Sequence, residues 1–149
     1  MGFLINFVII ALFIFPFIAL IHESGHAFFV KLFGGEISEF AIGNGEVLWK
    51  KKFFIIKKAY FVGGRVVAKN MEEFSKTQKA LIFLGGVIFN FLSAFVLDLF
   101  MGYEFGVFRN SLDSFIFVSY FNVVINLVPL TTIIGTSDGK KLVELYKTK

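Results

Sequence analysis

The chain has 149 residues, of which 56% are hydrophobic and 19% aromatic, and its mean hydropathy is +0.77. That is more apolar than an ordinary soluble domain, and the length suits one domain of about three spanning helices of ~20 residues each plus one sizeable loop. With no cysteine, a disulfide framework, a thiolate metal site and a cysteine nucleophile are excluded.

Three apolar runs predict membrane-spanning helices, over about residues 2–33, 79–98 and 112–129. The first carries no charge from Gly2 to Ile21, and the second contains an uncharged run of 18 residues, Ala80 to Leu97. Pro129 lacks a backbone N–H group and should end the third helix. A short tail helix is expected over about 138–147.

The segment over about residues 36–68 has a different pattern. Gly43-Asn44-Gly45 is turn chemistry, and aromatic and β-branched residues are frequent on both sides of it. We expect a small β-hairpin or sheet whose apolar faces rest on, or dip into, the membrane surface. The fold class is therefore membrane α-helical, with three transmembrane helices and a membrane-associated β-hairpin between the first two, all in a single domain spanning residues 1–149.

Basic residues predict the orientation. Ten of the 15 lysines and arginines lie between Lys31 and Lys79, and four lie from Lys140 onward. Because basic residues that flank spans stay in the cytoplasm, the β segment and the tail should be cytoplasmic, with the N-terminus and the loop over 102–113 outside. The net charge of +4 is explained in this way, so we expect no nucleic-acid partner. Size and the abundance of Phe, Ile and Lys favour a bacterial plasma membrane.

One motif carries chemistry. His22-Glu23-Ser24-Gly25-His26 matches H-E-x-x-H, in which histidines four residues apart project from one face of a helix and can share one Zn²⁺. Glu23 can then take a proton from a water bound to the metal. The alternative is a set of incidental polar residues at a helix end, but with only two histidines in the chain the chance of this pattern is on the order of one in a thousand.

A catalytic zinc needs a third protein ligand. The chain has no other histidine and no cysteine, so the ligand must be a carboxylate on the cytoplasmic side, and Asp138 is the first acid beyond the inner end of the third helix. Ser137-Asp138-Gly139 would equally suit an N-cap of the tail helix, so topology alone leaves both roles open for Asp138.

These residues resemble the site-2 protease family of intramembrane zinc metalloproteases. Its H-E-x-G-H motif is matched including Gly25, and Asn126-Leu127-Val128-Pro129 followed by Asp138-Gly139 is similar to its Asn-x-x-Pro stretch leading to Asp-Gly. The resemblance implies a minimal three-helix core in which Asp138 is the third zinc ligand. The spacing from Pro129 to Asp138 is longer than in the commonest members.

Weaker features of the same family follow in order. Gly86-Val87-Ile88-Phe89-Asn90 resembles its Gly-Pro-x-x-Asn, and Phe61 to Val66 resembles its Pro-Leu-Gly-Gly-x-Val. The resemblance implies that Asn90 and Asn126 hold the substrate strand or the oxyanion, although interhelical hydrogen bonding would also explain them. The strand that ends at Gly63-Gly64 could accept the substrate by strand addition. Gly85-Gly86 and Ser93 should only permit close helix packing.

The function that follows is an intramembrane zinc metalloprotease that hydrolyses peptide bonds in or near transmembrane segments of membrane-anchored proteins or peptides. Its expected partners are such a substrate, the lipid bilayer and a regulatory membrane protein.

Three other classes are open. A non-catalytic zinc-binding membrane protein, acting in immunity or assembly, would share every ligand. A channel or metal transporter would need polar groups along a continuous path, whereas here they gather at one depth. A different zinc protease family takes a glutamate as its third ligand, but neither Glu104 nor Glu144 lies in a suitable motif.

Overall fold

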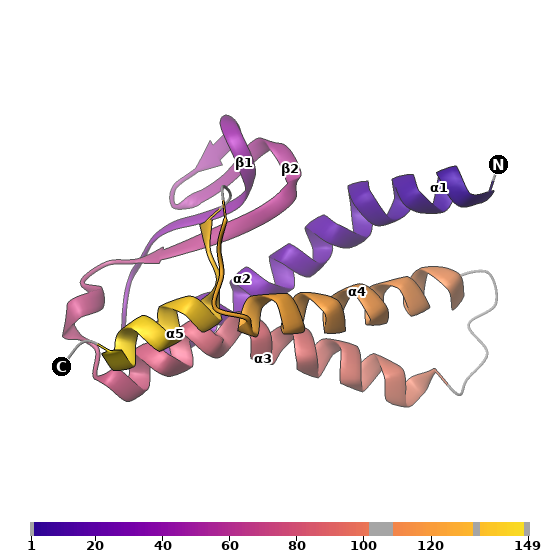
Figure 1. The fold of residues 1–149 in the computed structure, drawn as a ribbon. Coiled ribbons are helices and arrows are strands. Elements are labelled where there is room, and N and C mark those ends of the chain that lie inside the picture. The colour runs from indigo at the N-terminus through magenta and orange to yellow at the C-terminus, as the bar shows by residue number, and fades with distance from the viewer. Residues whose placement is uncertain (1, 102–108, 133–134, 148–149) are drawn as a thin grey trace.

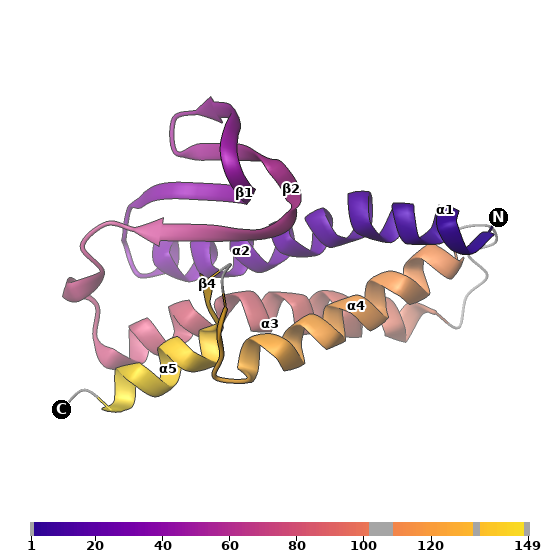
Figure 2. The same cartoon turned by 45° about the horizontal axis from the view of Figure 1, so that its top comes forward.

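The computed structural model describes residues 2–101, 109–132 and 135–147. Three long helical segments lie side by side, and a β-hairpin covers the second half of the first segment (Figures 1 and 2). Of the outer loop expected over 102–113, residues 102–108 fall outside the described residues, whereas residues 109–113 are helical.

The first helical segment is continuous from Gly2 to Leu32 but contains a change of pitch. Helix α1 covers Gly2–Ile9, the π-helical turn η1 covers Ile10–Ile14, and α2 covers Phe15–Leu32. Pro16 lacks an N–H group and crowds the carbonyl four residues earlier, so an ordinary α-helical turn cannot form there. The wider turn of η1 accommodates the proline without ending the helix.

The hairpin consists of β1 (Ile37–Lys51) and β2 (Phe54–Ala68), which pair antiparallel. It bends back on itself, because Phe40 of β1 pairs both with Phe54 at the start of β2 and with Val66 near its end. The predicted end of the strand at Gly63-Gly64 is wrong. Gly63 has a φ of 63° and turns the chain locally, but the following β-branched residues pair with the start of β1 and extend β2 to Ala68.

Helix α3 covers Lys76–Phe100 and begins with a capping box in which the side chains of Ser75 and Gln78 bind each other's backbone N–H groups. It contacts both α2 and α4, which covers Arg109–Leu127. Among the described helices, Leu4–Leu32 and Lys76–Phe100 are long and apolar enough to cross a membrane. The third spanning helix, expected over 112–129, stays a prediction, because α4 carries several polar side chains.

A small hairpin accounts for the unusual length of the connection after Pro129. The short strands β3 (Thr131–Thr132) and β4 (Gly135–Thr136) pair antiparallel and form a small hairpin. At its base the backbone N–H of Ser137 donates to the carbonyl of Leu130 over 3.0 Å. The hairpin closes at its base, so the additional residues do not separate α4 from the next helix. Helix α5 (Asp138–Lys147) therefore starts close to the end of α4.

Helices α2 and α3 pack closely where they cross. A Cβ atom built on Gly25 would collide with the carbonyl oxygen of Gly85, and one built on Gly85 would lie 2.5 Å from the carbonyl oxygen of Gly25. The two backbones thus touch, as the glycines of the second apolar run led us to expect. This contact fixes α2, which carries both histidines, against α3.

Candidate metal centre

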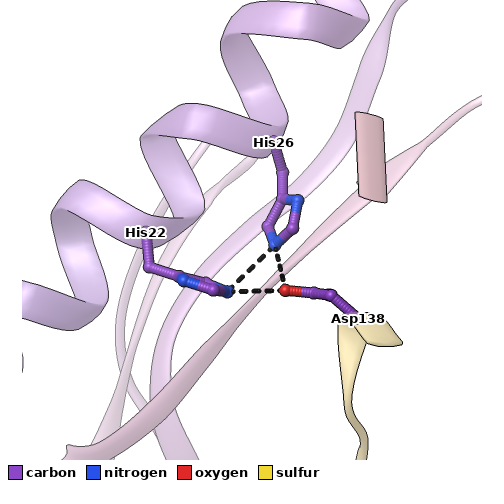
Figure 3. A group of neighbouring side chains, drawn as sticks. All are labelled: His22, His26 and Asp138. Carbon is purple, nitrogen blue, oxygen red and sulfur yellow. Dashed lines mark hydrogen bonds and ion pairs between the residues drawn. The ribbon is translucent and has the colours of Figure 1, made fainter. Parts of the chain in front are cut away.

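Two side chains of α2 meet one from the other end of the sequence, on the face of α2 that is turned toward α5. Atoms Nε2 of His22 and Nε2 of His26 lie 3.1 Å apart, and the Oδ2 atom of Asp138 lies 3.0 Å from the first and 3.4 Å from the second (Figure 3). All three residues are buried. The two histidines come from successive turns of α2, and the aspartate is the first residue of α5.

These atoms fit a zinc ion. Two ligands at about 2.0 to 2.1 Å from a tetrahedral zinc are roughly 3.3 Å from each other, close to the three separations found here. The Oδ2 atom of Asp138 is buried and has no hydrogen-bond partner among the described residues, so its acceptor capacity is left for a cation. Of the described His, Asp and Glu side chains, these three form the group that could hold a metal ion.

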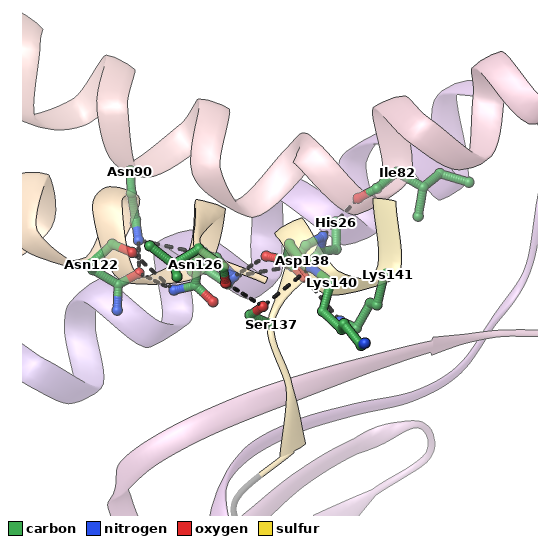
Figure 4. Close-up of polar contacts among 11 residues, drawn as sticks. His26, Ile82, Asn90, Asn122, Asn126, Ser137, Asp138, Lys140 and Lys141 are labelled. Carbon is green, nitrogen blue, oxygen red and sulfur yellow. Dashed lines mark hydrogen bonds and ion pairs between the residues drawn. The ribbon is translucent and has the colours of Figure 1, made fainter. Parts of the chain in front are cut away.

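Contacts behind the ligands orient them. The Nδ1–H group of His26 donates to the carbonyl of Ile82 over 2.7 Å, which leaves its Nε2 lone pair facing the site (Figure 4). The Nζ atom of Lys141 donates to Oδ1 of Asp138 over 2.9 Å. Burial by itself raises the pKa of Asp138, but the neighbouring rings of His22 and His26 and the charge of Lys141 outweigh it and hold that pKa below its usual range, which favours the carboxylate form.

The role of Asp138 as an N-cap is excluded. The hydroxyl of Ser137 accepts from the backbone N–H of Lys140 at 3.2 Å and donates to the carbonyl of Val128 at 2.7 Å. Ser137 is thus the cap of α5 and also ties that helix to the end of α4. Gly139 allows this approach, because a Cβ atom there would collide with the carbonyl oxygen of Leu127.

Gly86 makes room for the imidazole ring of His22. A Cβ atom at this position would lie 2.5 Å from Cε1 and Nε2 of the His22 ring. Sequence reasoning assigned Gly86 only a packing role, but its missing side chain is also the space that the imidazole occupies. Gly86 opens the stretch that resembles Gly-Pro-x-x-Asn, but only the structure shows why this position has to lack a side chain.

Glu23 lies beside the ligands in a cavity of about 470 Å³. Its side chain is buried and packs on Gly64 of β2, where a Cβ atom would lie only 2.6 Å from Cγ of Glu23. The cavity is bordered by β2 from Gly64 to Ala68 and by Gly135 and Thr136 of the small hairpin. The carboxylate thus lies between the two histidines and a strand edge that has no further strand paired to it within the described sheets.

The two predicted asparagines occupy different positions. Asn126 lines the cavity, whereas Asn90 has no exposed surface and lies behind His22, with its Nδ2 atom 3.3 Å from Nδ1 of the imidazole. Between them lies Asn122, whose Oδ1 accepts from Nδ2 of Asn90 at 3.0 Å and from Nδ2 of Asn126 at 2.8 Å (Figure 4).

Sequence reasoning missed Asn122 and Lys141. The signal for Asn122 was its spacing of four residues from Asn126, which places both amides on one face of α4. Lys141 was read only as one of the basic residues of the tail. Its spacing of three residues from Asp138 places it on the same face of α5.

Comparison with known proteins decides the family. Residues 8–129 match the family model described as "Peptidase family M50". The chain belongs to this family, the site-2 proteases. The resemblance read from the motifs is thereby confirmed, and with the two long apolar helices it identifies an integral membrane protein.

Individual relatives agree with this assignment. The chain is 36% identical over 110 residues to "Putative zinc metalloprotease FN1322" of Fusobacterium nucleatum, covering 65% of this chain and 31% of that protein. It is 30% identical over 113 residues to "Putative zinc metalloprotease" of Helicobacter pylori, covering 62% of this chain and 32% of the relative. It is also 31% identical over 88 residues to "Uncharacterized membrane protein YwmF" of Bacillus subtilis, covering 59% and 55%. The chain thus spans about half of the last and about a third of the other two.

Proposed function

We propose that this protein is a zinc metallopeptidase that cleaves membrane-anchored proteins or peptides in or near their transmembrane segments. The observation that carries the proposal is the meeting of His22, His26 and Asp138 beside Glu23, in a cavity bordered by an open strand edge. Family membership and the names of two relatives support the same activity.

His22, His26 and Asp138 would hold the zinc ion, which supplies a Lewis acid able to activate water and to polarise a carbonyl group. Glu23 is the general base that takes the proton from the attacking water and delivers it to the leaving amine. Its packing against Gly64 keeps the carboxylate at the strand edge, where the scissile peptide has to lie. Asn126 lines the same cavity, and its amide, which donates to Asn122 in this structure, would have to release one of those hydrogen bonds to donate to the developing oxyanion.

The substrate must present an extended segment, because a helix hides its carbonyl groups in its own hydrogen bonds. Residues 64–68 of β2 border the cavity on one side, and the hairpin of β3 and β4 borders it on the other. An unwound segment can pair with the edge of β2 by strand addition, with Gly64 beside the bond to be cleaved.

The exposed side chains suit a chain embedded in lipid. Phe13 is 68% exposed and Phe117, in α4, is 71% exposed, and in water such aromatic surface would be a liability. We infer that α4 is the third span, with the polar side chains of Asn122 and Asn126 turned inward. The β segment and the tail would then be cytoplasmic, and the apolar and lysine-rich tip of the hairpin, around Trp49, would rest at the headgroups of a bacterial plasma membrane.

The proposal predicts a chelator-sensitive cleavage activity. Purified protein, reconstituted with a panel of tagged single-span reporters, should carry one zinc per chain and release a shortened reporter, and Asp138→Ala should lose both the metal and the activity. Glu23→Gln should keep the zinc and lose cleavage, whereas the exposed control Glu46→Gln should keep both. Cleavage that persisted in Glu23→Gln would refute the general-base role, and a wild type without zinc would refute the site.

The non-catalytic alternative makes the opposite prediction. It rested on the long connection before Asp138, but the hairpin of β3 and β4 absorbs those residues and leaves Asp138 next to the histidines. A zinc-loaded protein that leaves every reporter of the panel intact would favour this alternative.

A further inference from the structure

The buried amide of Asn90 and the half-buried amide of Asn122 are too close to the metal centre to be only a link between helices. Asn90 has no exposed surface, and its Nδ2 atom faces Nδ1 of His22 at 3.3 Å and Oδ1 of Asn122 at 3.0 Å. Its own Oδ1 atom is buried and has no hydrogen-bond partner among the described residues. A buried amide oxygen without a partner costs about 1 to 3 kcal/mol.

This arrangement conflicts with a ligand role of His22. The atom of His22 that faces the site is Nε2, as its contacts with His26 and Asp138 show. When Nε2 gives its lone pair to a metal, Nδ1 of the neutral ring carries the proton and must donate it. The nearest described partner of Nδ1 is the amide of Asn90, which presents a donor to it. Two donors would then face each other.

We propose that in the metal-loaded protein the side-chain amides of Asn90 and Asn122 are both flipped, that is, rotated by half a turn about the Cβ–Cγ bond. The oxygen and nitrogen of an amide have almost the same size, so the turn exchanges their positions without moving the helices. Oδ1 of Asn90 then accepts from Nδ1–H of His22 and from Nδ2 of Asn122, and the unpaired oxygen is satisfied. Asn126 keeps its 3.0 Å hydrogen bond to the backbone carbonyl of Asn122 but gives up the 2.8 Å bond to Oδ1 of Asn122, because Nδ2 of Asn122 now takes that place. Its second N–H group then has to turn away from Asn122, toward the cavity that Asn126 lines.

Asn90 and Asn122 are thus positioning residues that hold His22 in the tautomer able to bind the metal. The inference rests on the metal site of the proposed function. Partners of this kind behind a ligating histidine typically contribute 10- to 100-fold to metal affinity. The geometry also gives a role to Asn122, which belongs to none of the motifs: it orients the amide of Asn90 by donating a hydrogen bond to it.

Substitutions at Asn90 separate this role from plain packing. Asn90→Asp offers only oxygen acceptors and should keep the zinc affinity of the wild type or exceed it. Asn90→Leu has nearly the same shape but no acceptor, and should lower zinc affinity by about 10- to 100-fold. Asn122→Ala should lower it by a smaller factor, roughly 3- to 10-fold. Ser119→Ala is the matched control, because Ser119 is equally buried in α4 and its hydroxyl has no hydrogen-bond partner among the described residues.

Zinc affinity is measured in detergent by competition with a chromophoric chelator, next to the thermal unfolding midpoint of the zinc-free proteins. A second readout uses the presence of only two histidines in the chain, whose ¹⁵N-labelled imidazoles give a simple spectrum. In zinc-loaded wild type both Nδ1–H protons should exchange slowly with water, and in Asn90→Leu that of His22 should exchange fast.

Equal losses of affinity in Asn90→Asp and Asn90→Leu, or an unchanged affinity in Asn90→Leu, would overturn the inference while leaving the zinc site intact. A wild type that binds no zinc would instead overturn the proposed function itself.

Discussion

Replacing Gly86 by alanine should damage the metal site while leaving the helix intact. The added methyl group would lie 2.5 Å from Cε1 and Nε2 of His22, whereas ordinary contacts measure 3.4 to 4 Å. The ring must therefore move by about 1 Å, several times the ±0.2 Å that metal–ligand distances tolerate. A displacement of that size costs roughly 100-fold in activity, and we expect a comparable loss of zinc affinity. Alanine also favours a helix over glycine by about 1 kcal/mol, so α3 itself should not suffer.

The assay compares zinc affinity with the unfolding midpoint of the zinc-free protein. Leu92→Ala in the same helix is the control, because that side chain is 49% exposed. We expect Gly86→Ala to lose zinc affinity at an unchanged or raised midpoint, and Leu92→Ala to keep its zinc. If Gly86→Ala bound zinc as tightly as the wild type, the argument that this glycine reserves space for the imidazole would fail.

Three further substitutions test other contacts. Lys141→Met removes the donor to Oδ1 of Asp138 and should lower zinc affinity by about 10-fold, measured by chelator competition. An unchanged zinc affinity would mean that this hydrogen bond does not support the metal site. Gly64→Val places a side chain where Glu23 lies, and should abolish reporter cleavage while the zinc content stays at wild-type level. Ser137→Ala removes the cap of α5 and should cost about 1 kcal/mol of unfolding free energy, with a lower melting midpoint of the zinc-free protein as the check.

The parts of the site that follow a short-range rule could be predicted from the sequence. His22 and His26 are one helical turn apart, so their convergence needs only the helix. For Asp138, topology left the roles of ligand and helix cap open, and the resemblance of Asp138-Gly139 to the family's Asp-Gly motif favoured the ligand. The role of each residue in catalysis stays a prediction until zinc binding and cleavage are measured.

Other features depend on tertiary structure that no local pattern encodes. The space above Gly86 exists only because α2 crosses α3 at Gly25. The strand end expected at Gly63-Gly64 came from the resemblance of Phe61 to Val66 to a family motif, but pairing with β1 continues the strand to Ala68. The hairpin between Pro129 and Asp138 was unforeseen because two strands of two residues are too short to produce a periodic signal.

The separation of the ligands along the chain has a consequence for biosynthesis. His26 and Asp138 are 112 residues apart, and the aspartate is added to the growing polypeptide long after the helix that bears the histidines. On the proposed function, a nascent chain that has inserted α2 and α3 would contain only two of the three zinc ligands and would not yet be able to attack neighbouring membrane proteins. A zinc ion bound by all three residues would close a loop of more than one hundred residues, and closures of such loops can contribute several kcal/mol to stability. Proteolytic competence and resistance to unfolding would thus be acquired in the same late step.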